Sequence, residues 1–219
     1  MNTFIGFIMG PMVWISLLVC LFGLVFKVVR IIREISAREH YLFSYISLKH
    51  SLRSIGAWLI PFFPRSTRIR PVYYAVSYLF HLLLFILPLF VMSHVVLVNE
   101  SFQVALPALN DQAADIMTLA VIGALIFFAL RRRMVRDVRY LTSWQDYLLL
   151  LVVALPFVSG FLAYHQVAPY RWMAVFHVLS GEFVLMVLPF SKFAHMVTAP
   201  LTRAYMGSEF GKVRHARDW

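Results

Sequence analysis

Five long apolar runs constrain the fold of this chain more than any other feature of its sequence. Each is long enough for a helix to cross the hydrocarbon layer of a bilayer, which is roughly 30 Å thick. Hydrophobicity is continuous within them and does not alternate, so a membrane β-barrel is excluded. The sequence therefore predicts an all-α integral membrane protein, a bundle of five transmembrane helices over residues 3–26, 72–98, 113–130, 147–165 and 172–197.

Composition agrees with this class. Apolar residues make up 61% of the chain and charged residues only 14%, which is far from the balance of a soluble domain. With no recognisable repeat or low-complexity tract, residues 1–219 are predicted to form a single membrane domain. The first run lacks a basic leader and a small-residue cleavage pattern, so it is expected to stay as a helix. The single cysteine, Cys20, excludes an intrachain disulfide and a covalent C-x-x-C-H haem motif.

Positive charge falls in alternate connections and predicts the orientation. All Lys and Arg residues except Arg171 lie in residues 27–70, 131–139 and 192–219. Cytoplasmic loops of membrane proteins are enriched in Lys and Arg. We therefore expect the N-terminus outside and the C-terminus in the cytoplasm. The net charge of +10 then reflects membrane topology, and nucleic acid is not expected as a partner.

The connection between the first and second runs has helical periodicity. Apolar and aromatic residues recur at spacings of three and four from Tyr41 to Leu59, with serines and basic residues at the other positions. Pro61 and Pro64 end the pattern. It predicts an amphipathic helix on the inner membrane surface. Two roles remain open for this helix: a lipid-surface anchor, or a docking site for a cytoplasmic subunit.

Two of the runs carry a pair of histidines, His81 with His94 and His177 with His195. Ionisable side chains inside a membrane are costly and tend to mark functional sites. In an antiparallel arrangement, His81 reaches the depth of His195, and His94 reaches that of His177. Two imidazoles can bind a haem iron from opposite sides and favour electron transfer. The sequence thus predicts two haem b groups, an inner one on His81 and His195 and an outer one on His94 and His177.

The spacing within each pair sets a geometric requirement. In an ideal helix the 18-residue interval from His177 to His195 keeps both on one face, about 27 Å apart along the axis. The 13-residue interval from His81 to His94 leaves these side chains about 140° apart around the helix. Pro88 lies between them and could twist the helix enough to reduce the mismatch.

Further residues are candidates for contacts with a cofactor or substrate. Arg171 and Lys192 could neutralise haem propionates or extend to the lipid interface. Gly181 could let a flat porphyrin approach or serve in ordinary helix packing. Glu182 and His165 could accept protons from a quinol. The alternatives for these two are a carboxyl hydrogen-bonded between helices and an interfacial histidine.

The arrangement resembles a known family. Five helices, with a histidine pair on the second and an H-x17-H pair on the fifth, resemble the cytochrome b (gamma) subunit of respiratory nitrate reductase, although the second-helix interval is longer here. A closer similarity is to the cytochrome b subunits of transmembrane redox complexes in sulfate-reducing bacteria, of the high-molecular-weight cytochrome complex type. The segments that carry it are SLRSIG (51–56), PFFP (61–64), YLFH (78–81) and SHVV (93–96).

The resemblance implies a function in electron transfer. It implies a subunit of the bacterial cytoplasmic (inner) membrane that passes electrons between an outer multihaem cytochrome c or menaquinol and a cytoplasmic iron–sulfur protein. A function of a different class is a haem-free helical anchor or small transporter. In that case the four histidines would form interhelical hydrogen bonds or relay protons.

Overall fold

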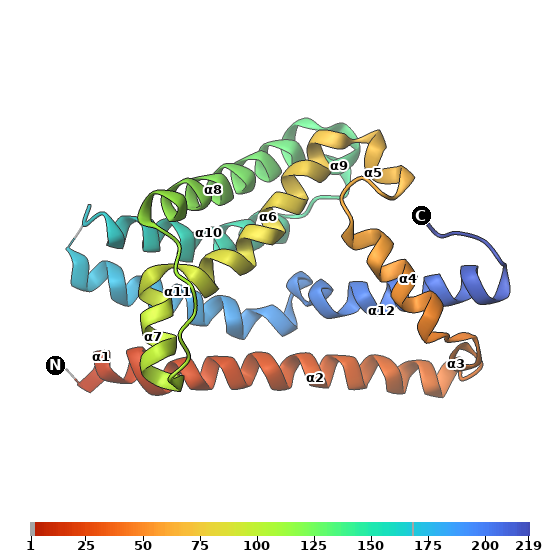
Figure 1. Ribbon diagram of the computed structural model, residues 1–219, viewed down its shortest axis with the longest axis horizontal. Helices are drawn as coiled ribbons and strands as arrows, with labels where there is room; N and C mark the ends of the chain where they lie inside the picture. The colour runs from red at the N-terminus through yellow and green to blue at the C-terminus, as the bar shows by residue number, and fades with distance from the viewer. Residues whose placement is uncertain (1–2, 168) are drawn as a thin grey trace. The chain divides into compact units, whose positions relative to one another are not determined.

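The computed structural model describes residues 3–167 and 169–219, and this part of the chain is helical with no β-strand (Figure 1). Five helical segments are long and apolar enough to cross a membrane: Thr3–Arg38, Pro71–Phe90, Asp111–Met134, Trp144–Tyr164 and Tyr170–Phe190. The predicted all-α class and the five apolar helices are confirmed. The orientation in the membrane stays a prediction.

Contacts group the chain into two compact units. One unit comprises the chain up to Tyr74 together with Glu182–Trp219, and the other comprises Ala75–Gly181. The prediction that both belong to a single membrane domain stays a prediction.

The first span is longer than predicted. Helices α1 (Thr3–Phe7) and α2 (Val13–Arg38) are joined by a π-helical turn, η1 (Ile8–Met12), that contains Pro11. Proline lacks a backbone N–H, and a π turn is one way in which a helix accommodates this. The helix continues through a basic segment because charged residues leave the apolar layer without ending helical geometry.

The second predicted helix, residues 72–98, is in fact two helices. Helix α6 (Pro71–Phe90) is followed by the extended residue Val91, and α7 (Met92–Phe102) begins directly after it. Pro88 cannot donate a backbone hydrogen bond within α6, which weakens the last turn of that helix. His81 and His94 therefore lie on different helices, and the 140° mismatch expected for one continuous helix does not apply.

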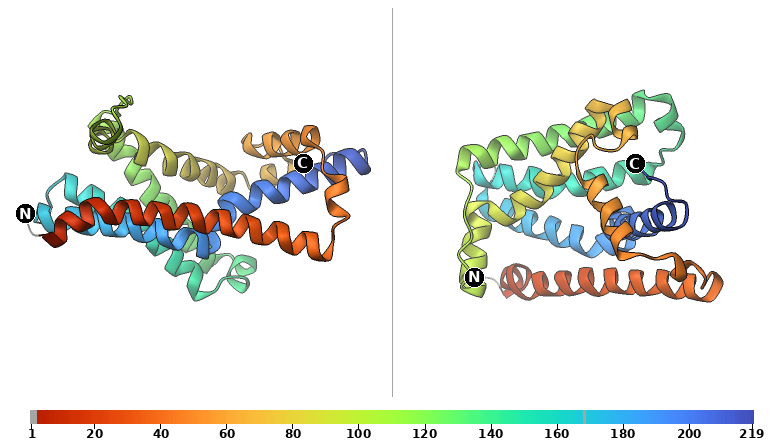
Figure 2. Two further views of the ribbon diagram at one scale, coloured as in Figure 1. Left: turned by 90° about the horizontal axis from the view of Figure 1, so that it is seen from below. Right: turned by 45° about the vertical axis from the view of Figure 1, so that its right-hand side comes forward.

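The third and fourth spans agree with the prediction to within a few residues. Helix α8 (Asp111–Met134) is capped by the Asn110 side chain, which accepts a hydrogen bond from the Ala113 N–H at 2.8 Å. The short helix α9 (Arg136–Tyr140) leads to α10 (Trp144–Tyr164), which begins at a capping box formed by Ser143 and Asp146. Helices α8 and α10 run side by side in Figures 1 and 2.

The fifth predicted helix, residues 172–197, is also divided. Helix α11 (Tyr170–Val187) is followed by two 3₁₀ turns, η2 (Leu188–Phe190) and η3 (Lys192–Ala194), with the extended residue Ser191 between them. Helix α12 (His195–Ser208) then begins, and a π turn, η4 (Glu209–Val213), follows it. The break lies at Pro189. His177 and His195 are thus on separate helices, and the axial distance expected for one continuous helix does not apply.

The predicted amphipathic helix is present and ends before Pro61, as expected. It is shorter at its start, because α3 (Leu42–Tyr45) is separated from α4 (Leu48–Leu59) by the extended residues Ile46 and Ser47. After α4 the chain forms the short helix α5 (Arg65–Ile69) and enters α6. Helix α4 packs closely on α12 within the first unit (Figure 1).

Candidate functional site: two histidine pairs

His177 is positioned on α11 by contacts with α10. Its Nδ1 lies 2.9 Å from the carbonyl oxygen of Pro156. The ring is half-buried and lies against Gly160, where an added Cβ would be 2.9 Å from His177 Cε1. The missing side chain at Gly160 therefore makes the room that this imidazole occupies.

His94 is positioned by the helix break that precedes it. Its Nδ1 lies 2.9 Å from the carbonyl oxygen of Pro88, six residues earlier in the sequence. A continuous α-helix pairs residues three and four apart, so this contact depends on the extended backbone at Val91. The same break that separates α6 from α7 also orients the imidazole.

The structure brings His94 and His177 together within the second unit. Their ring centres are 5.9 Å apart, and the ring planes are inclined by 21°. An imidazole nitrogen binds a metal ion at about 2 Å, so two imidazoles on opposite sides of one metal have ring centres roughly 6 Å apart. The ring centres of this pair are separated by close to that distance, which makes the two residues candidate ligands of one iron.

The other two histidines also place Nδ1 against a backbone carbonyl oxygen, in each case one that is near in sequence. His81 Nδ1 lies 2.7 Å from the Ser77 carbonyl oxygen on α6, and His195 Nδ1 lies 2.9 Å from the Lys192 carbonyl oxygen at the start of α12. They belong to different units. Their pairing at one haem therefore stays a prediction.

One tautomer is shared by all four histidines. A carbonyl oxygen can only accept a hydrogen bond, so each Nδ1 carries a proton, and in the neutral ring Nε2 is then the nitrogen with the lone pair. Metal-binding histidines are commonly fixed in this way, with the second nitrogen donating to a backbone carbonyl. Two other histidines do not follow this pattern. The Nε2 of His165 lies 3.0 Å from Asp115 Oδ1. The Nδ1 of His50 has the Ser47 hydroxyl as its partner, not a backbone carbonyl.

The residues fit haem better than a metal ion held by protein alone. In the described part of the chain, no group of three or more His, Cys, Asp or Glu side chains could hold a metal ion. A haem iron needs only two axial protein ligands, because the porphyrin occupies the other positions. A histidine pair is therefore a complete ligand set for haem and an incomplete one for a structural zinc.

Among the other predicted residues, Arg171 and Lys192 are both exposed, as either predicted role requires. A Cβ on Gly181 would meet no atom within 4 Å, so close packing does not explain this glycine.

Glu182 is 3% exposed, and neither carboxyl oxygen has a hydrogen-bond partner among the described residues. The predicted alternative of a carboxyl hydrogen-bonded between helices is thus not what the structure has.

His165 lies next to α8 and forms a partly exposed pair with Asp115. The centre of the His165 ring lies 4.4 Å from the centre of the Phe161 ring. A histidine beside a carboxylate can exchange a proton, but the pair equally suits an interfacial position. Its predicted role toward a quinol stays a prediction.

The positioning residues on α10 were not identified from the sequence. They are Gly160, the Pro156 carbonyl group and Ser159. The Ser159 hydroxyl oxygen lies 3.4 Å from His177 Nδ1 and 3.4 Å from Ser180 Oγ. The same hydroxyl donates a hydrogen bond to the Leu155 carbonyl oxygen at 2.6 Å. The signal available was the small-residue pair Ser159-Gly160 in an otherwise bulky apolar helix, since small residues mark close helix contacts in membranes.

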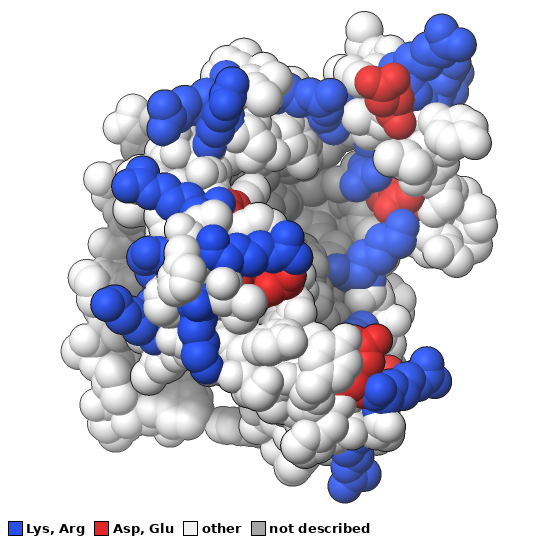
Figure 3. Space-filling view, turned by 90° about the vertical axis from the view of Figure 1, so that its right-hand side faces the viewer, with Lys and Arg blue, Asp and Glu red and all other residues white. Residues whose placement is uncertain are grey.

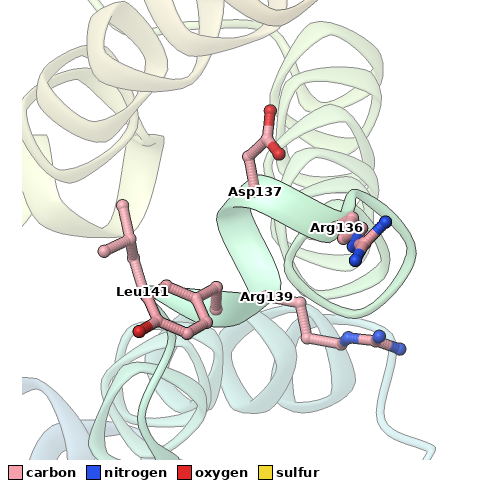
Figure 4. A pocket seen from close by; sticks show the side chains of 5 residues that line it. Arg136, Asp137, Arg139 and Leu141 are labelled. Atoms are coloured by element: carbon pink, nitrogen blue, oxygen red, sulfur yellow. The ribbon is translucent and has the colours of Figure 1, made fainter.

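An open pocket of about 500 Å³ lies at α9 (Figure 4). It is lined by Arg136, Asp137, Arg139, Tyr140 and Leu141. None of the predicted site residues contributes to it, so we do not assign it a role in the candidate site.

No protein-family model and no solved structure matches the chain. A protein of Nitratidesulfovibrio vulgaris (strain Hildenborough) is 37% identical to it over 212 residues, which cover 94% of this chain and 92% of the relative. The chain therefore belongs to the same protein family as this Nitratidesulfovibrio protein.

Proposed function

We propose that the chain is a di-haem b electron-transfer subunit of a membrane respiratory complex. The observation that carries the proposal is the common tautomer of His81, His94, His177 and His195. All four place Nδ1 against a backbone carbonyl oxygen, and His94 and His177 have ring centres 5.9 Å apart, a separation that suits one iron.

In this proposal, His94 and His177 hold the outer haem, and His81 and His195 hold the inner one. The backbone carbonyls of Pro88 and Pro156 fix the outer rings in position. When bound, haem supplies a one-electron redox centre. The chain's own residues would hold that centre and surround it with apolar side chains, and Arg171 and Lys192 would balance the propionate charge.

The side of the membrane that each histidine pair faces is proposed from the charge distribution. With the basic connections in the cytoplasm, the inner pair faces a cytoplasmic iron–sulfur protein, and the outer pair faces a multihaem cytochrome c or menaquinol. The bacterial cytoplasmic membrane is the proposed location. Glu182 and the pair of His165 with Asp115 are the candidate proton acceptors if a quinol is the donor.

Haem content of the purified full-length chain tests the proposal. The chain is produced in haem-replete cells, extracted in mild detergent, and examined by a reduced-minus-oxidised spectrum and by haem quantification against protein. We expect a b-type spectrum and about two haems per chain. A colourless protein that is folded and helical would reject the proposal and favour the helical anchor or small transporter.

A further inference from the structure

Helix α4 has one face that is closed by packing on α12. Ser51, Ser54 and Ala57 are all buried there. The Ser51 hydroxyl donates to the Ala204 carbonyl oxygen at 2.9 Å and lies 2.9 Å from the Ser208 hydroxyl. A Cβ on Gly207 would lie 2.6 Å from the His50 carbonyl oxygen. Small side chains thus let the two helices come into close contact.

A second face of α4 is apolar and uncovered. Leu48, Leu52 and Leu59 are 74%, 59% and 71% exposed. Their spacing places them within about 40° of one another around the helix axis. The amphipathic helix is therefore inverted relative to one in a soluble protein, because its small polar residues pack inward and its leucines point outward.

A third face carries positive charge beside the leucines. Lys49 and Arg53 lie roughly 100° and 140° around the helix from Leu48. The basic residues Arg65, Arg68 and Arg70 follow in and around α5, and residues 40–99 contain no Asp or Glu. Figure 3 views the side on which α4 lies, where many Lys and Arg side chains are visible and fewer acidic ones. This surface is electrostatically complementary to an anionic partner.

The position of α4 in the chain restricts what that partner can be. The helix is tied on both sides to apolar spans by short connections, residues 39–47 before it and 60–70 after it. Its outward face therefore stays near the level at which α2 and α6 enter the membrane. A row of leucines flanked by Lys and Arg is the pattern of a helix lying in the bilayer interface.

We propose that α4 is an interfacial helix that binds anionic lipid, with its leucine face among the acyl chains and with Lys49 at the headgroups. Arg53 lies beside Lys49, with its guanidinium over the Trp219 ring at 5.0 Å from the ring centre. Helix α12 fixes its rotation, because the serine face is held against Ala204 and Ser208. The inference does not depend on haem binding. Of the two roles open for this helix in the sequence, the structure favours the lipid anchor.

Spin labels on the full chain test this placement. In a Cys20→Ser background, one label is attached at Leu52→Cys and, as the matched control, another at Lys49→Cys. The proteins are reconstituted in vesicles of phosphatidylcholine with phosphatidylglycerol. Collisions with oxygen, which concentrates in lipid, and with a water-soluble nickel chelate are then measured.

We expect the label at position 52 to collide mainly with oxygen and the label at position 49 mainly with nickel. Vesicles of phosphatidylcholine alone should lower the ratio of oxygen to nickel collisions at position 52, because the headgroup attraction is lost. Equal nickel access at both positions would overturn the proposal. Protection of position 52 from both reagents would also overturn it, because a second copy of the chain would then cover the leucine face.

Discussion

The imidazole rings of His94 and His177 lie nearly parallel, with centres 5.9 Å apart, and neither ring uses the other as its hydrogen-bond partner. Each donates its Nδ1 proton to the carbonyl oxygen of a proline, Pro88 for His94 and Pro156 for His177. A pair that served only structure would gain most from a direct hydrogen bond. This pair is instead oriented by its surroundings, as metal ligands are.

The space at Gly160 should control the outer haem. Replacing Gly160 by Ala places a methyl group 2.9 Å from His177 Cε1, so the ring has to move. We expect the haem content of Gly160→Ala to fall from about two to about one per chain. Haem quantification with a reduced-minus-oxidised spectrum measures this.

Gly123→Ala is the matched control for this substitution, because a Cβ on Gly123, in α8, meets no atom within 4 Å. It should keep both haems and gain a little stability from the higher helix propensity of alanine. If Gly160→Ala keeps the full haem content and an unchanged spectrum, the assigned role of Gly160 is wrong.

The crossing of α4 and α12 should be sensitive to a single methyl group. In Gly207→Ala the new Cβ meets the backbone carbonyl of His50, and α4 has to separate from α12. Overpacking of this kind costs about 1–3 kcal/mol in the free energy of unfolding. Denaturant unfolding in detergent, followed by circular dichroism, measures the change.

Gly56→Ala on α4 is the comparison variant, since a Cβ there meets nothing within 4 Å. It should be as stable as the parent protein or slightly more stable. Equal stability of the two variants would show that α4 does not pack on α12 as described.

Helix α2 should be equally intolerant of a side chain at Gly23. A Cβ there would lie 2.6 Å from Pro189 Cγ, at the turn where α11 ends. Because His195 follows this turn closely, we expect Gly23→Ala to lower both the melting temperature and the haem content. Gly10→Ala, near the start of the same span and without neighbours within 4 Å, should leave both unchanged. A Gly23→Ala protein that melts with the parent would contradict the packing.

Hydropathy was sufficient to locate all five spans, because lipid requires continuous apolar helices. The four candidate histidines could likewise be picked out from the sequence, because they stand within apolar runs. The break at Val91 was not predicted, although Pro88 indicated a distortion of the helix. A proline removes one hydrogen bond, and whether the helix then bends or stops depends on tertiary partners. One such partner is the Leu109 N–H, which donates a hydrogen bond to the Phe90 carbonyl oxygen at 2.8 Å.

The orientation of α4 shows a second limit of the sequence. Its periodicity was correctly interpreted, but periodicity gives two faces without saying which one is covered. Ser51 and Ser54 are buried because α12 supplies Ala204, Gly207 and Ser208, which are about 150 residues away in sequence. The role of Gly160 was missed for the same reason, because only the folded chain places His177 against it.

Haem content in a set of histidine variants tests the central claim most directly. His94→Ala, His177→Ala and the double variant are purified in parallel and compared with the parent chain. If both residues bind one iron, all three variants should hold about one haem per chain, and the double variant should lose no more than either single one. Retention of two haems in either single variant, or the loss of both haems in the double variant alone, would contradict the account.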